Sequence, residues 1–331
     1  MEIIGRCGII SKKALTLLPY GTHAKGEQIR KMLALGWIKE KECQISFYGR
    51  KRKEYRTERG YVLWNPRRHV EEYRKEVTWE LEDAMRVHIS GLKKETVFRS
   101  LRQSEIMAML YGQGLEYITA GMVKTMMDEN LETTFDTDRI VSGRAYGIVI
   151  ADQKLTTVYD LWNRDYQSLS RASETSFLDA AEEYTGKMRS GVRLVFGKNY
   201  GVLEGIIYKR AEYRQFRNGV TFLSDTTYTK TLLVPKSKDG RKILYLSMIP
   251  GAVEVLGKAV GGAGGKEEGE RLNFLYPDVN AMSTFLARAQ RGSRIIAYDV
   301  MKDGLEKVRG DVEVVYVSLD EVYDAVMRLL M

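Results

Sequence analysis

Four acidic residues have the chemistry of a divalent-metal site: Glu105, Asp152, Asp160 and Glu174. If two or more of these carboxylates met in the folded chain, with a lysine or another base nearby, they would hold a metal ion able to hydrolyse phosphodiesters. The chain contains 44 Asp and Glu residues, however, and scattered acids in such a chain are usually separate side chains on the surface. A metal-dependent DNA nuclease is therefore only an alternative function, and no residue is singled out as catalytic.

Other residue patterns argue against zinc, nucleotide and serine-hydrolase chemistry. His23, His69 and His88 are not spaced as metal ligands relative to one another or to either cysteine. The glycine-rich run at 261–265 precedes Lys266, but its spacing and the residue after the lysine do not match a phosphate-binding loop. No serine stands in a Gly-x-Ser-x-Gly phrase. We expect no metal and no cofactor.

The positive charge of the first 69 residues indicates a different chemistry. They hold 16 Lys and Arg against 6 Asp and Glu, whereas the remaining residues hold 36 and 38. Four consecutive cations stand at 50–53. Adjacent cations repel one another unless counterions or phosphates lie close, and each neutralised phosphate releases condensed counterions. The pattern predicts double-stranded DNA as the partner, and an acidic protein is the alternative.

The order of elements before these cations is that of a helix-turn-helix. Ser11 is expected to cap a helix over 12–18, which breaks at a Pro-Tyr-Gly turn. Thr22 is expected to cap a second helix, over 24–35, in which apolar residues recur near the helical period. Gly36 then ends that helix.

The segment that follows predicts a β-hairpin with a basic tip. Residues 44–48 alternate between apolar and polar side chains, and so do residues from 54 to 64. The four cations at 50–53 lie between these two strands. A hairpin directly after a helix-turn-helix would be a wing.

These residues resemble a known family. The order from Ala14 to Ile38, followed by residues 50–61, is similar to the winged-helix domains of bacterial regulators. Among these it most resembles the replication-relaxation proteins of plasmids and conjugative elements. The phrase R-x-Y-x-L-T-x-x-G, which closes the wing in such domains, is represented here by Lys-Glu-Tyr-Arg-Thr-Glu-Arg-Gly at 53–60.

The resemblance implies a function for each part of the chain. The first domain would bind DNA in the replication, transfer or transcriptional control of a mobile genetic element, and the second would have a restriction-endonuclease-like core. Such winged-helix domains carry a helix ahead of the pair. Residues 1–8 are short and interrupted by glycine, so a helix beginning near Val70 is expected to complete the bundle.

The metal-binding phrases of an active nuclease core are largely missing from this chain. An active core has an acid at the start of one strand and E-x-K on the next, but Tyr146 and Tyr159 stand there beside a single acid, Asp160. The resemblance therefore implies a degenerate core that forms a homodimer or recruits a protein partner.

The residues expected to contact DNA come from three places. The helix over 24–35 would enter the major groove, the loop at 50–53 would lie over the backbone or minor groove, and residues 67–68 would add phosphate contacts. These residues are Lys25, Gln28, Arg30, Lys31, Arg50, Lys51, Arg52, Lys53, Arg56, Arg67 and Arg68.

The predicted architecture is α+β overall, in three parts: a winged-helix domain over 1–69, a helical connector over 70–139 and an α/β domain over 140–331. Helices are expected at 70–88, 95–111, 120–128, 173–188, 202–216, 252–260, 281–290 and 319–330. Strands are expected at 146–151, 156–162, 192–196, 231–234, 243–247, 272–275, 294–298 and 312–317. This alternation favours a mixed or parallel sheet.

The composition indicates a cytoplasmic protein that does not contact membranes. The sequence lacks the run of about 18 apolar residues needed to span a bilayer, and the first residues lack the apolar core of a signal peptide. Two cysteines are too few for a disulfide framework.

Overall fold

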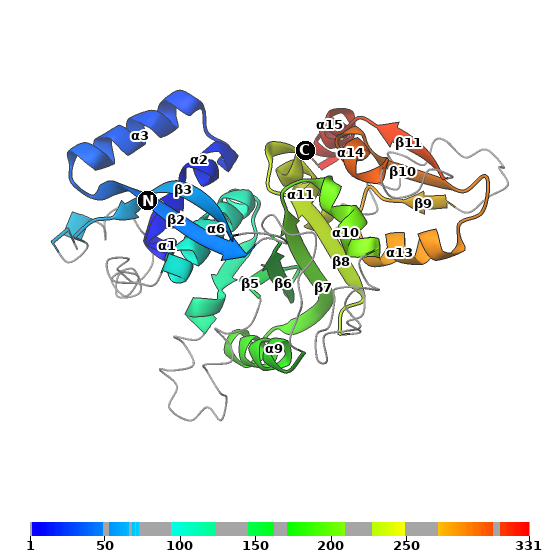
Figure 1. Cartoon of the computed structure of the whole chain (residues 1–331), viewed down its shortest axis with the longest axis horizontal. Coiled ribbons are helices and arrows are strands. Elements are labelled where there is room, and N and C mark those ends of the chain that lie inside the picture. The colour runs from blue at the N-terminus through cyan, green and yellow to red at the C-terminus, as the bar shows by residue number, and fades with distance from the viewer. Residues whose placement is uncertain are drawn as a thin grey trace. The chain divides into compact units, whose positions relative to one another are not determined.

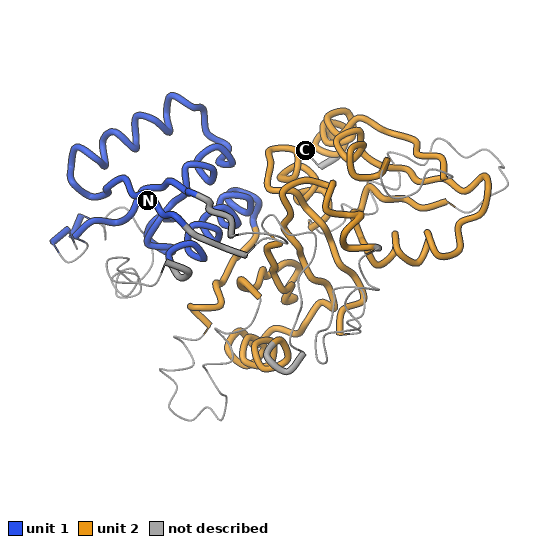
Figure 2. Tube along the Cα trace, in the orientation of Figure 1, with its two compact units in different colours: residues 1–114 blue, residues 115–331 orange. Residues whose placement is uncertain are grey.

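The computed structural model describes residues 2–48, 53–65, 68–69, 71–72, 94–123, 145–161, 171–208, 227–248, 271–306 and 312–330. They belong to two compact units, Met1–Gly114 and Leu115–Met331, which Figure 2 shows in different colours. Helices and sheets of mixed strand direction occur together, so the protein is α+β overall, as predicted. In the part of the chain that is described, no helix is long and apolar enough to cross a membrane.

Unit 1 combines four helices that surround a small antiparallel sheet in the described residues (Figure 1). Its elements in chain order are α1 (Glu2–Cys7), β1 (Ile9–Ser11), α2 (Lys12–Leu17), α3 (Thr22–Ala34), β2 (Ile38–Tyr48), β3 (Lys53–Leu63) and α6 (Lys94–Leu110). The three strands are ordered β1-β3-β2, and both pairings are antiparallel.

The ends of α2 and α3 follow from local hydrogen bonding. The Ser11 hydroxyl accepts a hydrogen bond from the Ala14 amide at 2.8 Å, which confirms the predicted cap of α2. Thr22 does not cap α3, because the capping position is Gly21 and Thr22 is already helical. Gly36 has a positive φ of 71° and ends α3, with its amide donating to the Leu33 carbonyl at 3.0 Å.

Strands β2 and β3 form a longer hairpin than the alternation of residues 44–48 predicted. They pair continuously, from Ile38 opposite Leu63 to Tyr48 opposite Lys53. The hairpin begins early because Ile38 is buried at its base, where the Trp64 amide also donates to the Trp37 carbonyl at 2.8 Å. The connecting residues 49–52 lie outside the described residues.

The first helix of unit 1 differs from the prediction. Residues 2–7 form α1 in spite of Gly5, because Ile3, Ile4 and Cys7 are all buried. Tertiary burial can stabilise a helix that is too short to form alone. Almost all of the helix expected at 70–88 lies outside the described residues, and it is α6 that packs against α1, α2 and β1.

A glycine in β3 permits this packing. Gly60 pairs with Ser11 of β1. A Cβ atom at position 60 would lie 2.5 Å from the Ile10 carbonyl oxygen and 2.9 Å from a methyl group of Leu101 in α6. The closing glycine of the wing phrase therefore lets three elements approach one another.

Within the described ranges, unit 2 contains a five-stranded mixed sheet and a three-stranded parallel sheet, in agreement with the predicted mixed or parallel pattern. The first has the order β4 (Glu116–Thr119), β5 (Gly147–Ala151), β6 (Lys154–Asp160), β7 (Met188–Gly197) and β8 (Lys230–Pro235). Strands β4 to β6 form an antiparallel meander, whereas β6, β7 and β8 are parallel. The second sheet has β10 (Arg294–Tyr298) between β9 (Arg271–Asn273) and β11 (Glu313–Val317).

Helices and 3-10 turns connect these strands. They are α9 (Arg171–Thr185), η1 (Tyr200–Val202), α10 (Leu203–Tyr208), α11 (Lys238–Met248), α13 (Val279–Arg288), η4 (Asp299–Met301), α14 (Lys302–Leu305) and α15 (Leu319–Leu330). A continuous apolar core joins the two sheets, and it includes Leu233 of β8, Phe285 of α13 and Ala297 of β10. The expected helix at 252–260 and the glycine-rich run at 261–265 lie outside the described residues.

One predicted strand is wrong. Residues 243–247 belong to helix α11, in which Ile243, Leu244 and Leu246 are buried. The Ser237 hydroxyl accepts a hydrogen bond from the Gly240 amide at 3.0 Å at the start of this helix. A short apolar run does not by itself distinguish a strand from a buried helix, and here the cap and the tertiary contacts decide.

A separate helical connector was expected over 70–139. The described residues of this range belong partly to unit 1 and partly to unit 2. Helix α6 packs in unit 1, whereas β4 pairs with β5 in unit 2. The boundary between the two units therefore falls at Gly114 and Leu115.

Replacing Gly60 with alanine should destabilise the protein by about 1–3 kcal/mol, because the added methyl group would overlap a backbone carbonyl that cannot move alone. Gly26→Ala in α3 is the matched control. A Cβ atom there meets nothing within 4 Å, and the substitution should stabilise by roughly 0.5–1 kcal/mol. Urea unfolding of both variants measures the difference, and equal midpoints would contradict the packing described for Gly60.

Candidate nucleic-acid interface

Helix α3 presents an inner and an outer face within unit 1. Ile29 and Met32 are its buried residues, whereas Arg30 and Lys31 are exposed. At 3.6 residues per turn, Arg30 lies about 160° around the helix from Met32. The Arg30 guanidinium donates to the carbonyl of Gly26, one turn earlier, at 3.4 Å. Two of the predicted DNA contacts are thus on the outer face of α3.

Two other predicted DNA contacts line a cavity on the inner side of α3. Lys25 and Gln28 both border this cavity, which has a volume of about 390 Å³. Lys25 is half-buried, and its ammonium group donates to the Leu18 carbonyl at 3.4 Å. Gln28 is exposed as well as bordering the cavity. The helical period of the sequence could place Lys25 and Arg30 on different sides of the helix, but it could not show which side borders a cavity.

The predicted contacts on the wing are described only in part. Lys53 and Arg56 lie on β3, opposite Tyr48 and Ile45 of β2. Beyond the hairpin, Arg68 is exposed, and its amide donates to the Asn65 carbonyl at 2.9 Å. The other predicted contacts, Arg50, Lys51, Arg52 and Arg67, lie outside the described residues.

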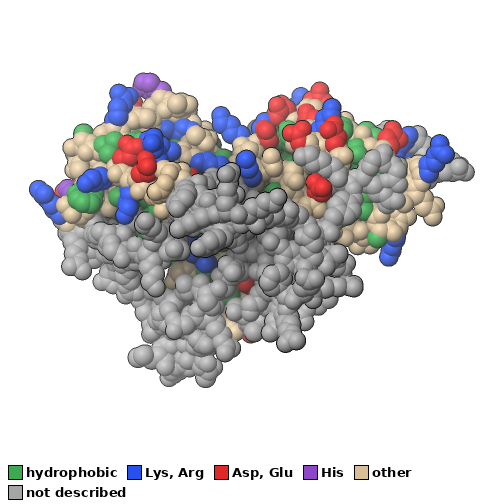
Figure 3. Space-filling model, viewed as in Figure 1, with side chains coloured by type: hydrophobic (Ala, Val, Ile, Leu, Met, Phe, Trp, Pro, Cys, Tyr) green, Lys and Arg blue, Asp and Glu red, His purple; other side chains and the backbone are tan. Residues whose placement is uncertain are grey.

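Two further cations near the hairpin, Lys12 and Arg59, were not predicted as DNA contacts. In the structure each forms an ion pair with an acid of β2. Lys12 of α2 forms an ion pair with Glu40 of β2 at 2.5 Å, and this hydrogen bond raises the pKa of Lys12 and lowers that of Glu40. Arg59 of β3 pairs with Glu42 at 2.8 Å. Figure 3 shows Lys and Arg side chains spread over the visible part of unit 1. These paired cations contribute less net charge than the run at 50–53.

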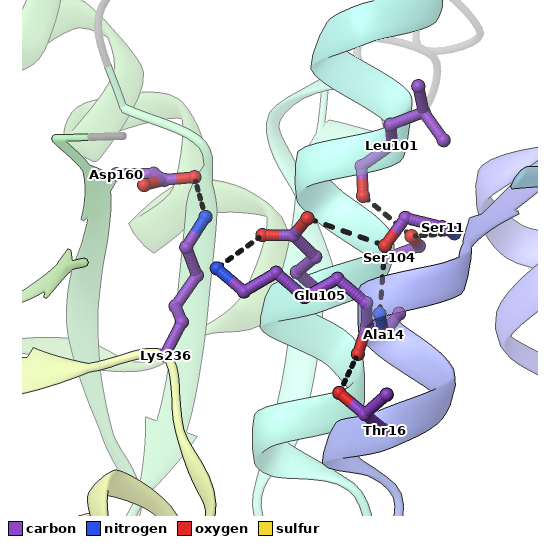
Figure 4. Close-up of polar contacts among 9 residues, drawn as sticks. Ser11, Ala14, Thr16, Leu101, Ser104, Glu105, Asp160 and Lys236 are labelled. Carbon is purple, nitrogen blue, oxygen red and sulfur yellow. Dashed lines mark hydrogen bonds and ion pairs between the residues drawn. The ribbon is translucent and has the colours of Figure 1, made fainter. Parts of the chain in front are cut away.

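The four candidate metal ligands do not come together in one site in the described residues. Glu105 of α6 accepts from the Ser11 hydroxyl at 3.4 Å and lies 3.9 Å from the Lys13 ammonium (Figure 4). Asp152 is exposed in the turn between β5 and β6, with a positive φ of 49°. Over the described ranges, no three His, Cys, Asp or Glu side chains converge to hold a metal ion.

Asp160, the acid at the expected E-x-K position, forms a buried ion pair. It ends β6, and its carboxylate accepts from the ammonium of Lys236, which follows β8, at 2.9 Å (Figure 4). Both side chains are almost fully buried. The two residues are 76 positions apart, so no local phrase could have revealed their contact. The lysine compensates the charge that a metal would otherwise have to compensate.

Tyr159 and Glu174 belong to a second buried polar cluster. The Tyr159 hydroxyl donates to the Glu174 carboxylate at 2.7 Å, and the Tyr228 hydroxyl donates to Thr157 at 2.9 Å. Burial raises the pKa of Tyr159 well above its ordinary value and raises that of Tyr228 to about 12. The Arg193 guanidinium stacks over the Tyr228 ring, 4.8 Å from its centre. These buried side chains bond to one another, as is typical of groups that stabilise a fold.

Comparisons with family models, curated proteins and solved structures found no match to this chain.

Replacing Asp160 with asparagine should destabilise the protein by about 3–5 kcal/mol, because Lys236 would lose the carboxylate that offsets its buried charge. The double variant Asp160→Leu and Lys236→Met should regain most of this loss, since it removes both charges. Urea unfolding of the two variants and the natural chain measures both effects. A single variant as stable as the natural chain would show that the pair is not a buried ion pair in solution.

Proposed function

We propose that this protein binds double-stranded DNA through unit 1, as a winged-helix protein does. The observation that carries the proposal is the order of elements in unit 1. A helix, a strand, two helices and a long hairpin follow one another, with the sheet ordered β1-β3-β2. This is the order of a winged helix, in which α3 would be the recognition helix and the β2–β3 hairpin the wing.

The distribution of charge supports the same proposal. The first 69 residues carry 16 Lys and Arg against 6 Asp and Glu. Arg30 and Lys31 are exposed on α3, and the four consecutive cations at 50–53 follow β2 in the sequence, with Lys53 as the first residue of β3. A recognition helix enters the major groove, while cations on a flanking loop contact phosphates and fix the register of the protein on the duplex.

The geometry of α3 favours Arg30 and Lys31 over Lys25 and Gln28 as the main DNA contacts. Arg30 and Lys31 point away from the core of unit 1, whereas Lys25 and Gln28 border the inner cavity. Gln28 is exposed enough to reach a base edge from the side of the helix. We therefore propose Arg30 and Lys31 as the central contacts and Gln28 as a peripheral one.

The biological setting is proposed on the resemblance alone. Similarity to replication-relaxation proteins favours a cytoplasmic role in the replication, transfer or transcriptional control of a mobile element. Unit 2 would then form a homodimer or hold a protein partner. The Asp160 carboxylate, which a nuclease would need for a metal ion, is buried and paired with Lys236. This pair favours a protein-binding role for unit 2 over nuclease activity.

Replacing both Arg30 and Lys31 with alanine in the full chain should weaken duplex binding and reduce the salt slope of log K by about 2, because two phosphate contacts would be lost. The matched control replaces Lys238 and Arg291, two exposed cations of unit 2, with alanine. Fluorescence anisotropy of a labelled duplex, measured across salt concentrations, compares the two variants. Equal losses in both variants would mean that only overall charge matters and that α3 has no special role.

The wing can be tested separately from base recognition. Replacing Arg50, Lys51, Arg52 and Lys53 with alanine should weaken binding to all duplexes alike and flatten the salt dependence.

Replacing Gln28 should cost about 1–3 kcal/mol of binding free energy at a preferred DNA site and little at other sites, if its side chain meets a base edge. A uniform loss for Gln28→Ala across a random-sequence library would exclude base recognition by this residue.

A further inference from the structure

Strand β11 forms an open edge of the three-stranded sheet in unit 2. It pairs with β10 on one side, and no strand of the described residues pairs with its other side (Figure 1). The Glu313 amide donates to the Ser293 carbonyl at 3.2 Å, so the backbone groups of residues 313, 315 and 317 face β10. Because successive residues of a strand turn their N–H and C=O groups to opposite edges, those of Val314 and Tyr316 point to the open edge. Such an edge is a template for another strand.

The other edge strands of the described sheets are protected from such pairing. Strands β1 and β4 are almost wholly buried, and an isolated bridge to Asp278 covers part of β8. Strand β2 carries Lys39 and Lys41, and β9 is only three residues long and begins at Arg271. Strand β11 has the sequence Glu-Val-Val-Tyr-Val, without the lysine or proline that commonly protects an edge, and Val315 is 39% exposed.

We propose that β11 pairs with β11 of a second copy of this chain, in the antiparallel direction, about a two-fold axis at Val315. This register places Val314 of each copy opposite Tyr316 of the other. These are the two residues whose backbone groups face the open edge, and an antiparallel pair of this kind exchanges both of its N–H···O=C bonds. The same surface is used by both copies, so the pairing closes as a dimer and does not extend into a fibre.

The side chains of β11 are suited to each other in this register. The Tyr316 ring lies across from Val314, and pairs of aromatic and β-branched side chains stabilise sheets. The two exposed Val315 side chains face each other where antiparallel strands are closest. The charged residue of β11, Glu313, lies opposite a valine, and within its own chain the Arg294 guanidinium donates to it at 2.5 Å. No like charges are opposed, which favours a second copy as the partner.

This inference names a surface for the homodimer that is one alternative of the proposed function, and its consequence for DNA rests on that function. A two-fold dimer carries two copies of unit 1. Dimeric helix-turn-helix proteins bind two half-sites whose symmetry mirrors their own. The preferred DNA site would then be a palindrome.

Sedimentation equilibrium of the full chain without DNA measures the dimer. The average mass should rise with concentration toward twice the mass of one chain. Val315→Lys places two ammonium groups at the closest point of the strand pair and should raise the dissociation constant of the dimer at least tenfold. Met188→Lys is the matched control, because it adds the same charge at an exposed apolar residue of the other sheet of unit 2. A chain that stays monomeric at its highest soluble concentration, or equal effects of the two variants, would overturn the proposal.

A cysteine at the two-fold axis tests the register. In the proposed pair the two Cα atoms at position 315 lie about 4.5 Å apart, within reach of a disulfide, whereas those at position 317 lie about 13 Å apart. With oxidised glutathione, Val315→Cys should therefore give a covalent dimer on a non-reducing gel, and Val317→Cys should not. The natural Cys7 and Cys43 are buried, and the natural chain gives the background. Equal cross-linking of both variants, or none in either, would contradict the proposed pairing.

Anisotropy with a labelled duplex separates this inference from the proposed function. Val315→Lys should bind the duplex at least threefold more weakly than Met188→Lys, although both add one positive charge, because only a dimer holds two copies of unit 1 on one duplex. A monomeric natural chain that binds duplex DNA would overturn the dimer and leave the proposed function standing. A dimer that binds no duplex would contradict the proposed function and leave the pairing of β11 standing.

Discussion

The contact between β1 and α6 organises unit 1, and the buried side chain of Ser11 is at its centre. The Ser11 amide donates to the Ser104 hydroxyl at 3.0 Å, and its own hydroxyl both caps α2 and donates to Glu105 (Figure 4). A buried polar group costs free energy when it is left without a partner, so these bonds hold α2 and α6 in one arrangement. Through Gly60, β3 joins the same junction, which positions the hairpin.

The same junction explains how unit 1 exposes α3. Helices α1, α2 and α6 bury much of their apolar surface around β1, whereas α3 buries only Ile29 and Met32. A helix held by so few buried side chains keeps most of its surface available for a partner. It also leaves the cavity that Lys25 borders. The outer face, where Arg30 and Lys31 are exposed, suits a polyanion.

Unit 2 differs from unit 1 in that buried polar side chains pair at the end of the five-stranded sheet and between this sheet and α9. The Asp160–Lys236 pair crosses the ends of three parallel strands, and Tyr159 bonds to Glu174 between β6 and α9. Pairs of this kind add little to stability compared with apolar packing, but each becomes costly when one partner is removed. The pairs therefore favour one arrangement of strands and helices over others. A rigid domain of this kind suits the proposed role of unit 2 in binding a protein partner.

The sequence by itself determined the parts of this protein that depend on neighbouring residues. The cap at Ser11, the end of α3 at Gly36, the hairpin around 50–53 and the alternation of strands and helices in unit 2 all follow from short patterns. The concentration of positive charge in the first fifth of the chain also needs only counting.

Tertiary structure decided whatever depends on residues far apart in the chain. Residues 2–7 form a helix because α6 and the sheet bury them, and residues 243–247 form a helix and not a strand. Asp160 meets Lys236 across 76 positions. Likewise, a helical period places Lys25 and Arg30 on different sides of α3, but it does not say which side faces a cavity. Local propensities are worth less than a kcal/mol per residue, whereas burial of a single large apolar side chain is worth about 1.5–3 kcal/mol, so packing overrides the local pattern where the two disagree.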